Sequence, residues 1–195
     1  MRIVVVNHLT LDGVMQSPSH PDEDTRNGFD RGGWAAANTD EVMNRFLGVG
    51  TSPSDGSLLF GRRTYEHFYG FWPKQTDDNP FTERLNRARK YVASRTLAEP
   101  LPWENSTLLE GGDATDAVAT LKEQGGPDAV VLGSGELIRS LMQRGLIDEL
   151  RLLIHPIVLG KGRRMFGDDG ALAKLRLAES VTTTTGVVIA RYEAV

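Results

Sequence analysis

The chain has 195 residues, of which 39% are hydrophobic and 25% are charged, and its formal net charge is -4. This length suits one domain that folds without disulfides or a structural metal, so we expect residues 1–195 to form a single domain. The acidic balance argues against binding to nucleic acid or to an anionic membrane surface. The sequence contains no cysteine, which excludes disulfides, thiolate metal sites and cysteine nucleophiles.

The apolar run at the N-terminus is too short for a secretory signal, and no stretch approaches the ~20 apolar residues of a membrane helix. The four histidines are scattered without the spacing of metal ligands. We therefore expect a cytoplasmic protein without a metal site or a membrane span.

In chain order, the predicted elements alternate between short apolar strands and helices. Strands are expected at 2–8, 57–60, 90–93, 106–109, 129–132 and 148–155, and helices at 40–47 (capped by Thr39), 62–69, 81–87, 114–124 and from 135 to before Gly145.

Two further segments complete this prediction. Residues 16–33 are polar and contain several prolines and glycines, which predicts a long surface loop of a kind that is often functional. Residues 175–192 read as two strands joined around Thr185 and Gly186, an antiparallel hairpin. The whole order predicts an α/β fold with a mixed, mostly parallel sheet that helices cover on both faces.

A glycine-rich turn follows the strand at 129–132. Gly133, Ser134 and Gly135 open a helix that continues with Glu136 and Leu137. Glycines allow a close approach of the backbone to a ligand, and the free amides of a helix start favour phosphate. The full dinucleotide fingerprint is missing because Ile138 stands where its third glycine belongs. A tight turn without a ligand therefore explains these residues equally well.

Two other strand ends carry residues suited to a phosphate. Gly61 precedes Arg62, Arg63 and Thr64 at a predicted helix start, where basic residues are disfavoured unless an anion compensates them. Guanidinium groups bind a phosphate monoester, such as the 2′-phosphate of NADPH, in bidentate fashion. A solvated basic first turn is the alternative. The third strand end carries Ser94, Arg95 and Thr96. Because ligands of open α/β sheets lie outside the carboxyl ends of the strands, the three turns are expected to line one crevice.

Acidic residues supply weaker candidates for catalysis. Asp12 follows the first strand and could orient a substrate or a water molecule, or it could bond to its own backbone as a turn residue. Asp40 and Glu41 suit the start of a helix. His8 lies inside an apolar run, which favours a structural role over that of a base.

Several motifs together resemble the dihydrofolate-reductase-like superfamily. Residues 60–66 resemble its glycine-arginine-x-threonine signature, and residues 133–137 resemble its glycine-rich turn at the cofactor pyrophosphate. Residues 145–150, 155–162 and Phe166 look like the reductase domain of the bifunctional riboflavin-biosynthesis deaminase–reductase. Thr10-Leu11-Asp12-Gly13 matches the serine-leucine-aspartate-glycine segment of that branch, with Thr10 in place of serine.

The resemblance implies a three-layer α/β/α sandwich of the dihydrofolate-reductase type that ends in an antiparallel hairpin, and a homodimer. It also implies that NADPH binds over the strand ends. Arg62 and Thr64, with Gly61, Ser94, Arg95 and Thr96, would hold its 2′-phosphate and adenosine part. The pyrophosphate would lie on Gly133, Ser134, Gly135, Glu136 and Leu137, and the nicotinamide would lie near Leu11, Asp12 and Gly13.

The activity implied by the resemblance is hydride transfer from NADPH to a C=N or C=O group of a small heterocyclic or sugar-like substrate, similar to 5-amino-6-(5-phosphoribosylamino)uracil reductase. Asp12 is the candidate catalytic residue. A zinc deaminase domain is excluded, because its cysteine ligands are missing. The alternatives are a binding module that holds NADP or a related nucleotide without catalysis, and dihydrofolate reduction proper. The resemblance to dihydrofolate reductases would place a pterin-binding carboxylate on the first helix, where Asp40 or Glu41 aligns only loosely.

Overall fold

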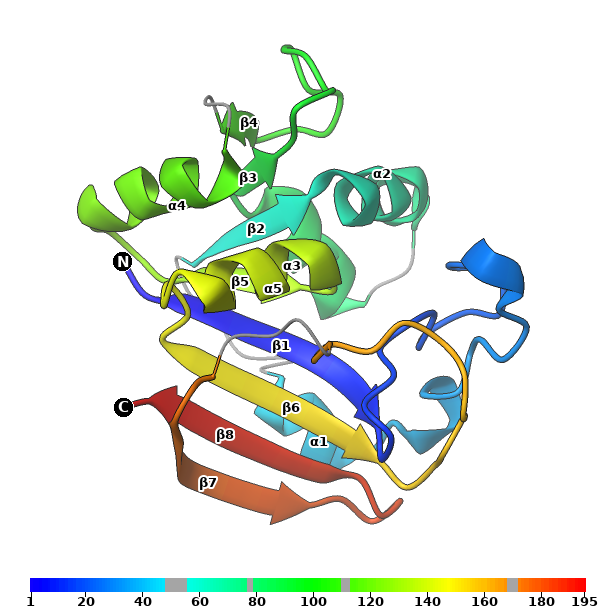
Figure 1. Ribbon diagram of the computed structural model, residues 1–195. Helices are drawn as coiled ribbons and strands as arrows, with labels where there is room; N and C mark the ends of the chain where they lie inside the picture. The colour runs from blue at the N-terminus through cyan, green and yellow to red at the C-terminus, as the bar shows by residue number, and fades with distance from the viewer. Residues whose placement is uncertain (48–55, 77–78, 110–112, 168–171) are drawn as a thin grey trace.

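An eight-stranded sheet forms the middle layer of the protein in its computed structural model, which describes residues 1–47, 56–76, 79–109, 113–167 and 172–195 (Figure 1). The strand order is β4-β3-β2-β5-β1-β6-β8-β7. Neighbours from β4 to β6 pair in parallel, whereas β6 with β8 and β8 with β7 pair antiparallel. The strands are β1 (Ile3–Thr10), β2 (Ser57–Gly61), β3 (Lys90–Ala93), β4 (Ser106–Leu109), β5 (Ala129–Leu132), β6 (Glu149–His155), β7 (Leu175–Thr182) and β8 (Val188–Ala194).

Within the described residues, five α-helices cover the two faces of this sheet. On one face α4 and α5 contribute to one apolar cluster, and on the other face α2 and α3 share a second cluster while α1 packs in a third. Their bounds are α1 (Glu41–Phe46), α2 (Arg62–Phe71), α3 (Pro80–Arg87), α4 (Ala114–Glu123) and α5 (Gly135–Gln143). Among the described helices, none is both long and apolar enough to cross a membrane.

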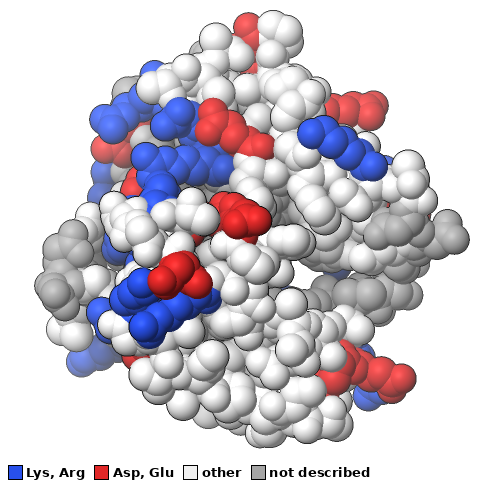
Figure 2. Space-filling view, turned by 90° about the vertical axis from the view of Figure 1, so that its right-hand side faces the viewer, with Lys and Arg blue, Asp and Glu red and all other residues white. Residues whose placement is uncertain are grey.

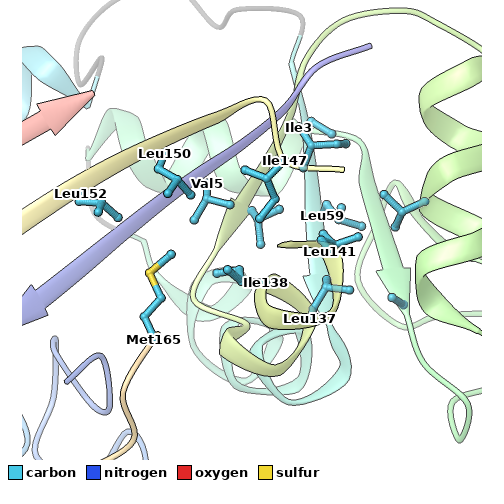
Figure 3. Close-up of a cluster of buried hydrophobic side chains, with 14 of the residues drawn as sticks. Ile3, Val5, Leu59, Leu137, Ile138, Leu141, Ile147, Leu150, Leu152 and Met165 are labelled. Atoms are coloured by element: carbon cyan, nitrogen blue, oxygen red, sulfur yellow. The ribbon is translucent and has the colours of Figure 1, made fainter. Parts of the chain in front are cut away.

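Alternation along the strands sends side chains to both helical layers. Ile3 and Val5 of β1 pack beneath α5, where Ile138 is fully buried (Figure 3). Val6 of the same strand packs on the opposite face, near Met43 of α1. Successive side chains of a strand point to opposite faces, so a sheet buried on both faces needs continuous apolar runs such as residues 3–6.

The structure confirms the predicted order of strands and helices and the antiparallel hairpin at the end of the chain. The prediction that Thr39 caps the first helix was wrong. Asp40 is the capping residue, and its carboxylate accepts a hydrogen bond from the amide of Met43 at 2.8 Å. Threonine and aspartate both suit the capping position. Asp40 also accepts two hydrogen bonds from Thr184, and this contact with the hairpin favours Asp40 as the cap.

The predicted loop at residues 16–33 runs along the carboxyl end of β1, on the side where β6 also ends (Figure 1). It is not purely a surface segment, because Gln16, Ser17 and Phe29 are buried. The indole of Trp34 donates to the carbonyl of Gln16 at 2.8 Å. This loop and the segment after β6 therefore pack together and build one wall beside the strand ends.

Candidate functional site

A cleft with a volume of about 1280 Å³ passes the carboxyl ends of the parallel strands β2, β3 and β5 and also reaches the start of β2 and the residues before β3. It is hereafter called the strand-end cleft, and all three predicted turns line it, namely residues 61–64, 93–96 and 133–137. Figure 2 looks onto the side of the molecule where the strands end, and there Lys and Arg side chains gather with Asp and Glu beside them. Residues 16–19 and 22–26 of the long loop also line the cleft.

Two of the turns are joined directly by hydrogen bonds. The amide of Gly61 donates to Oγ of Ser134 at 3.0 Å, and the amide of Ser134 donates to Oγ1 of Thr64 at 3.0 Å. Gly133 has φ +60, and a Cβ atom there would lie 3.2 Å from Cγ2 of Thr64. The hydroxyls of Ser134 and Thr64, both predicted to bind the cofactor, therefore also hold the ends of β2 and β5 together.

The helices that start at this joint lack side-chain caps. Gly61 precedes α2 and Ser134 precedes α5, and neither side chain caps its helix. By contrast, α1, α3 and α4 are capped by Asp40, Asn79 and Asp113. The first amides of a helix need acceptors, and an anion in the strand-end cleft would supply them for α2 and α5.

The third turn is shaped by a hydroxyl. Oγ of Ser94 accepts hydrogen bonds from the amides of Thr96 and Leu97 at 3.1 and 3.0 Å. The turn leaves Arg95 exposed at the cleft. Arg95 is therefore the charged side chain that this turn offers to a ligand, and the exposed Thr96 beside it offers a hydroxyl.

The arginines of the cleft lie near carboxylates. Arg62 is 3.7 Å from Glu66, whereas Glu136 lies 3.8 Å from Arg63 and 2.6 Å from Arg163. Except for that of Arg163, these side chains are well exposed, so each pair contributes little to stability and a phosphate can replace the carboxylate. Of the other predicted cofactor residues, Leu137 is buried in the core, and Gly135 lies against the side chain of Met15.

The turn at Leu11, Asp12 and Gly13 is not part of the cleft lining. Leu11 is 64% exposed. The Asp12 carboxylate accepts hydrogen bonds from Oγ1 of Thr10 at 2.6 Å and from the amides of Leu159 and Gly160 at 3.1 and 2.8 Å. The Thr10 hydroxyl, followed by these amides, lowers the pKa of Asp12 to about 2. Asp12 is thus an ionised anchor of the segment after β6, and its catalytic role stays a prediction.

Asp40 and Glu41 do not line the cleft either. Asp40 is committed to its cap and to Thr184, whose amide and hydroxyl each donate to it at 2.7 Å. Within the described residues, α1 contributes Phe46 to the cleft, and Leu47 follows it. This apolar contribution differs from the carboxylate that the resemblance to dihydrofolate reductases would place on the first helix.

A histidine pair lies at the site beyond the predicted residues. His8 of β1 lines the cleft, and its Nδ1 lies 2.9 Å from Nε2 of the fully buried His155. The sequence predicts a structural role for His8, because this residue stands in an apolar run. Its position two residues after Val6, on the face that α1 covers, was the signal for a side chain beside the cleft.

The residues at the strand-end cleft fit a dinucleotide phosphate. Gly133 and Gly135 are positions where a Cβ atom would collide with or crowd Thr64 and Met15, and the adjoining helix starts offer amides. Arg62, Arg63 and Arg95 supply positive charge in the same cleft. Among the described residues, no three His, Asp or Glu side chains lie together as metal ligands.

Comparisons with known proteins place this geometry in a family. The sequence model of the RibD C-terminal domain matches residues 2–189. The uncharacterized protein YyaP of Bacillus subtilis (strain 168) is 30% identical over 192 residues, which cover 96% of this chain and 92% of YyaP.

Solved structures show the same fold. A putative riboflavin biosynthesis protein from Shewanella sp. PV-4 has a TM-score of 0.66 and 22% identity, with coverage of 100% of this chain and 99% of that chain. A dihydrofolate reductase from Enterococcus faecalis, complexed with NADP(H), has a TM-score of 0.59 and 10% identity, with coverage of 99% and 96%. The sheet is accordingly that of a dihydrofolate-reductase-like fold, and the chain belongs to the family of RibD C-terminal domains.

Proposed function

We propose that this protein is an NADPH-dependent reductase of the riboflavin-biosynthesis type, which reduces a C=N or C=O group of a small heterocyclic or sugar-like substrate. The observation that carries the proposal is the meeting of three phosphate-suited turns in one cleft, with two helix N-termini that lack side-chain caps. Membership in the RibD C-terminal domain family supports the same reaction class.

Different residues of the cleft suit different parts of the cofactor. The amides at the start of α5 suit the pyrophosphate, because the helix dipole and the glycines favour a close anion. Arg62 and Thr64, with Arg95 at the end of the neighbouring strand β3, suit the 2′-phosphate. When bound, the reduced nicotinamide supplies the hydride, and the protein contributes orientation, which is worth about 7–11 kcal/mol in well-aligned systems.

The prediction that tests the cofactor concerns Arg62. Arg62→Ala should weaken NADPH binding about 10-fold or more and leave NADH binding nearly unchanged, because a guanidinium pair with a phosphate is lost only for NADPH. Quenching of tryptophan fluorescence during titration with each nucleotide measures both dissociation constants.

Arg144→Ala is the matched control. Arg144 is also half exposed and is paired with a carboxylate, Asp116 at 2.8 Å, but it does not line the cleft. Its loss should change neither dissociation constant. An equal loss of affinity for NADPH and NADH in Arg62→Ala would remove the proposed role of Arg62 at the 2′-phosphate.

Oxidation of NADPH with a panel of substrates separates the alternatives. Turnover of 5-amino-6-(5-phosphoribosylamino)uracil supports the proposed reaction, and methotrexate-sensitive turnover of dihydrofolate would make the protein a dihydrofolate reductase. Tight NADPH binding without oxidation on any pterin, pyrimidine or aldehyde would indicate a binding module. We propose further that the protein acts in the cytoplasm and as a homodimer.

A further inference from the structure

His8 lies near the end of β1, and its side chain points to the face of the sheet that α1 covers. The neighbouring Asn7 donates from Nδ2 to the carbonyl of Gly133 at 3.4 Å, so this part of β1 lies directly beside the turn. His8 itself points to the opposite face of the sheet and lines the strand-end cleft. A substrate in the part of the cleft that His8 lines would therefore meet the ring of His8.

The ring of His8 is held from behind by a chain of hydrogen bonds. Its Nδ1 lies 2.9 Å from Nε2 of His155, and Nδ1 of His155 lies 3.2 Å from Nδ2 of Asn38. The ring of Trp34 meets His155 edge-on, with 5.3 Å between the ring centroids. His155 is fully buried, so these hydrogen bonds are shielded from water on the side away from the cleft.

The direction of this chain follows from the donors. The side-chain nitrogen of Asn38 can only donate, so Nδ1 of the neutral His155 accepts and its Nε2 carries the proton. That proton is donated to Nδ1 of His8, which therefore places the proton of the neutral His8 ring on Nε2. No described residue hydrogen-bonds to Nε2 of His8, and His8 is half-buried at the cleft.

Both rings are neutral under ordinary conditions. Burial lowers the pKa of His8 to about 4, and repulsion from His155 adds to the effect. Burial also lowers the pKa of His155 to about 4. Trp34 and Asn38, which pack on the pair from the segment before α1, are uncharged. The hydrogen bonds from Asn38 to His155 and from His155 to His8 can all run in one direction only if both rings are neutral.

We propose that His8 binds the substrate, with Nε2–H donating a hydrogen bond to the oxygen or nitrogen of the C=O or C=N group that is reduced. This inference rests on the proposed function and adds to it the residue that recognises the reacting group. As the substrate carbon gains a hydride and its double bond opens, the electron pair of that bond moves to the heteroatom. Nε2–H of His8 stabilises the growing negative charge there, and water supplies the proton that completes the reduction.

His155 and Asn38 are positioning residues in this scheme. A donor fixed before the reaction costs no reorganisation when charge develops, and losing one such donor lowers turnover about 10²–10³-fold. A His8 ring free to change tautomer would present a bare nitrogen to the heteroatom part of the time, and two lone pairs would then repel each other.

The tautomer can be measured without turnover. Nuclear magnetic resonance of the protein labelled with ¹⁵N-histidine distinguishes protonated from bare ring nitrogens, and the chain has only four histidines to assign. From pH 6 to pH 8 we expect a proton on Nε2 and a bare Nδ1 in both His8 and His155. A proton on Nδ1 of His8, or a second proton taken up near pH 6.5, would overturn the inference.

Substitutions at His155 test the positioning. In His155→Gln the side-chain amide can still donate to His8, so the Nε2 proton of His8 should persist. In His155→Leu the donor is lost, and the His8 signals should shift towards a mixture of tautomers. An unchanged His8 tautomer in His155→Leu would contradict the proposal that the hydrogen bond from His155 fixes the tautomer of His8.

Kinetics with 5-amino-6-(5-phosphoribosylamino)uracil as the probe test the contact with substrate. His8→Leu should lower kcat at least about 100-fold while the NADPH dissociation constant stays within about twofold. His20→Gln, an exposed histidine outside the cleft lining, is the control and should leave both unchanged. If His8→Leu turns over as fast as the unaltered protein, the inference is wrong and the proposed function stands. If the unaltered protein neither binds nor oxidises NADPH, both are wrong.

Discussion

Asp12 illustrates how a candidate catalytic residue can be engaged by the backbone around it. Its carboxylate holds the amides of Leu159 and Gly160, and Leu11 and Gly13 bond through their own backbones to Ile157 and Met165. Two motifs far apart in the sequence, Thr10–Gly13 and the segment after Pro156, are thus one structural unit. The resemblance to the reductase domain rests partly on these two motifs, and their hydrogen bonds give both of them a structural role.

Asp12→Asn should separate the two roles. At pH 7 we expect a loss of about 1 kcal/mol in the free energy of unfolding, because an amide group replaces one acceptor of the backbone amides with a donor. The folded-state pKa of about 2 lies below the ordinary value for Asp. The stabilisation by Asp12 is therefore complete above about pH 4 and is lost as the pH falls towards 2.

Urea unfolding of both proteins at pH 7 and at about pH 2.5 measures this difference, which should be smaller at the lower pH. A difference that is independent of pH would exclude the carboxylate as its source. Unchanged turnover in Asp12→Asn would exclude the catalytic role, whereas lost turnover with unchanged stability would favour it.

Among the elements, the joint between β2–α2 and β5–α5 does the most to shape the site. Gly133 has a φ of +60 and lies against Thr64, whose hydroxyl accepts a hydrogen bond from the amide of Ser134. A side chain at Gly133 would strain the backbone and also push Thr64 away from its bond. The joint therefore depends on contacts between two separate strand ends.

Gly133→Ala should cost about 2–3 kcal/mol of unfolding free energy and weaken NADPH binding, because backbone strain and the contact with Thr64 add. Gly145→Ala is a matched control, because Gly145 has a similar φ of +63 but a Cβ atom there would meet nothing within 4 Å. Its cost should be the backbone strain alone, about 1–2 kcal/mol, with NADPH binding unchanged. Equal costs in urea unfolding would show that the contact with Thr64 does not matter.

At the scale of the whole molecule, the outer strand β7 leaves one edge of the sheet open. Leu175 and Leu177 lie two residues apart on this strand and are 38% and 52% exposed. Apolar side chains exposed on an edge strand favour pairing with another chain unless they are covered. This edge is where we expect the two subunits of the proposed homodimer to meet.

Leu177→Glu should shift the protein towards monomer at micromolar concentration, because the substitution places charge in the expected interface. Leu172→Glu is the control, since Leu172 is 92% exposed and lies outside the strand. Sedimentation velocity measures the mass of both variants. A monomeric unaltered protein, or a Leu177→Glu variant that remains dimeric, would contradict this interface.

The alternation of strands and helices was readable in the sequence because buried parallel strands need short apolar runs such as residues 129–132. Gly61 and Gly133 could be recognised as turn residues because glycine adopts backbone conformations that other residues avoid. The proposed role of His8 could not be predicted from the sequence, because its partner His155 is 147 residues away in the chain. The cap at Asp40 likewise depended on Thr184, which the hairpin brings to α1.

The type and order of the elements, the hairpin, and the charged and glycine-rich turns that suit a phosphate could be predicted from the sequence, because these features depend on local conformational preference and periodicity. Three further facts come from the folded arrangement of the chain: three turns line one cleft, Asp12 lies outside its lining, and burial keeps the paired His8 and His155 neutral. Those facts depend on which strands become neighbours, and burial and hydrogen bonding between distant residues then set the charge and direction of each group.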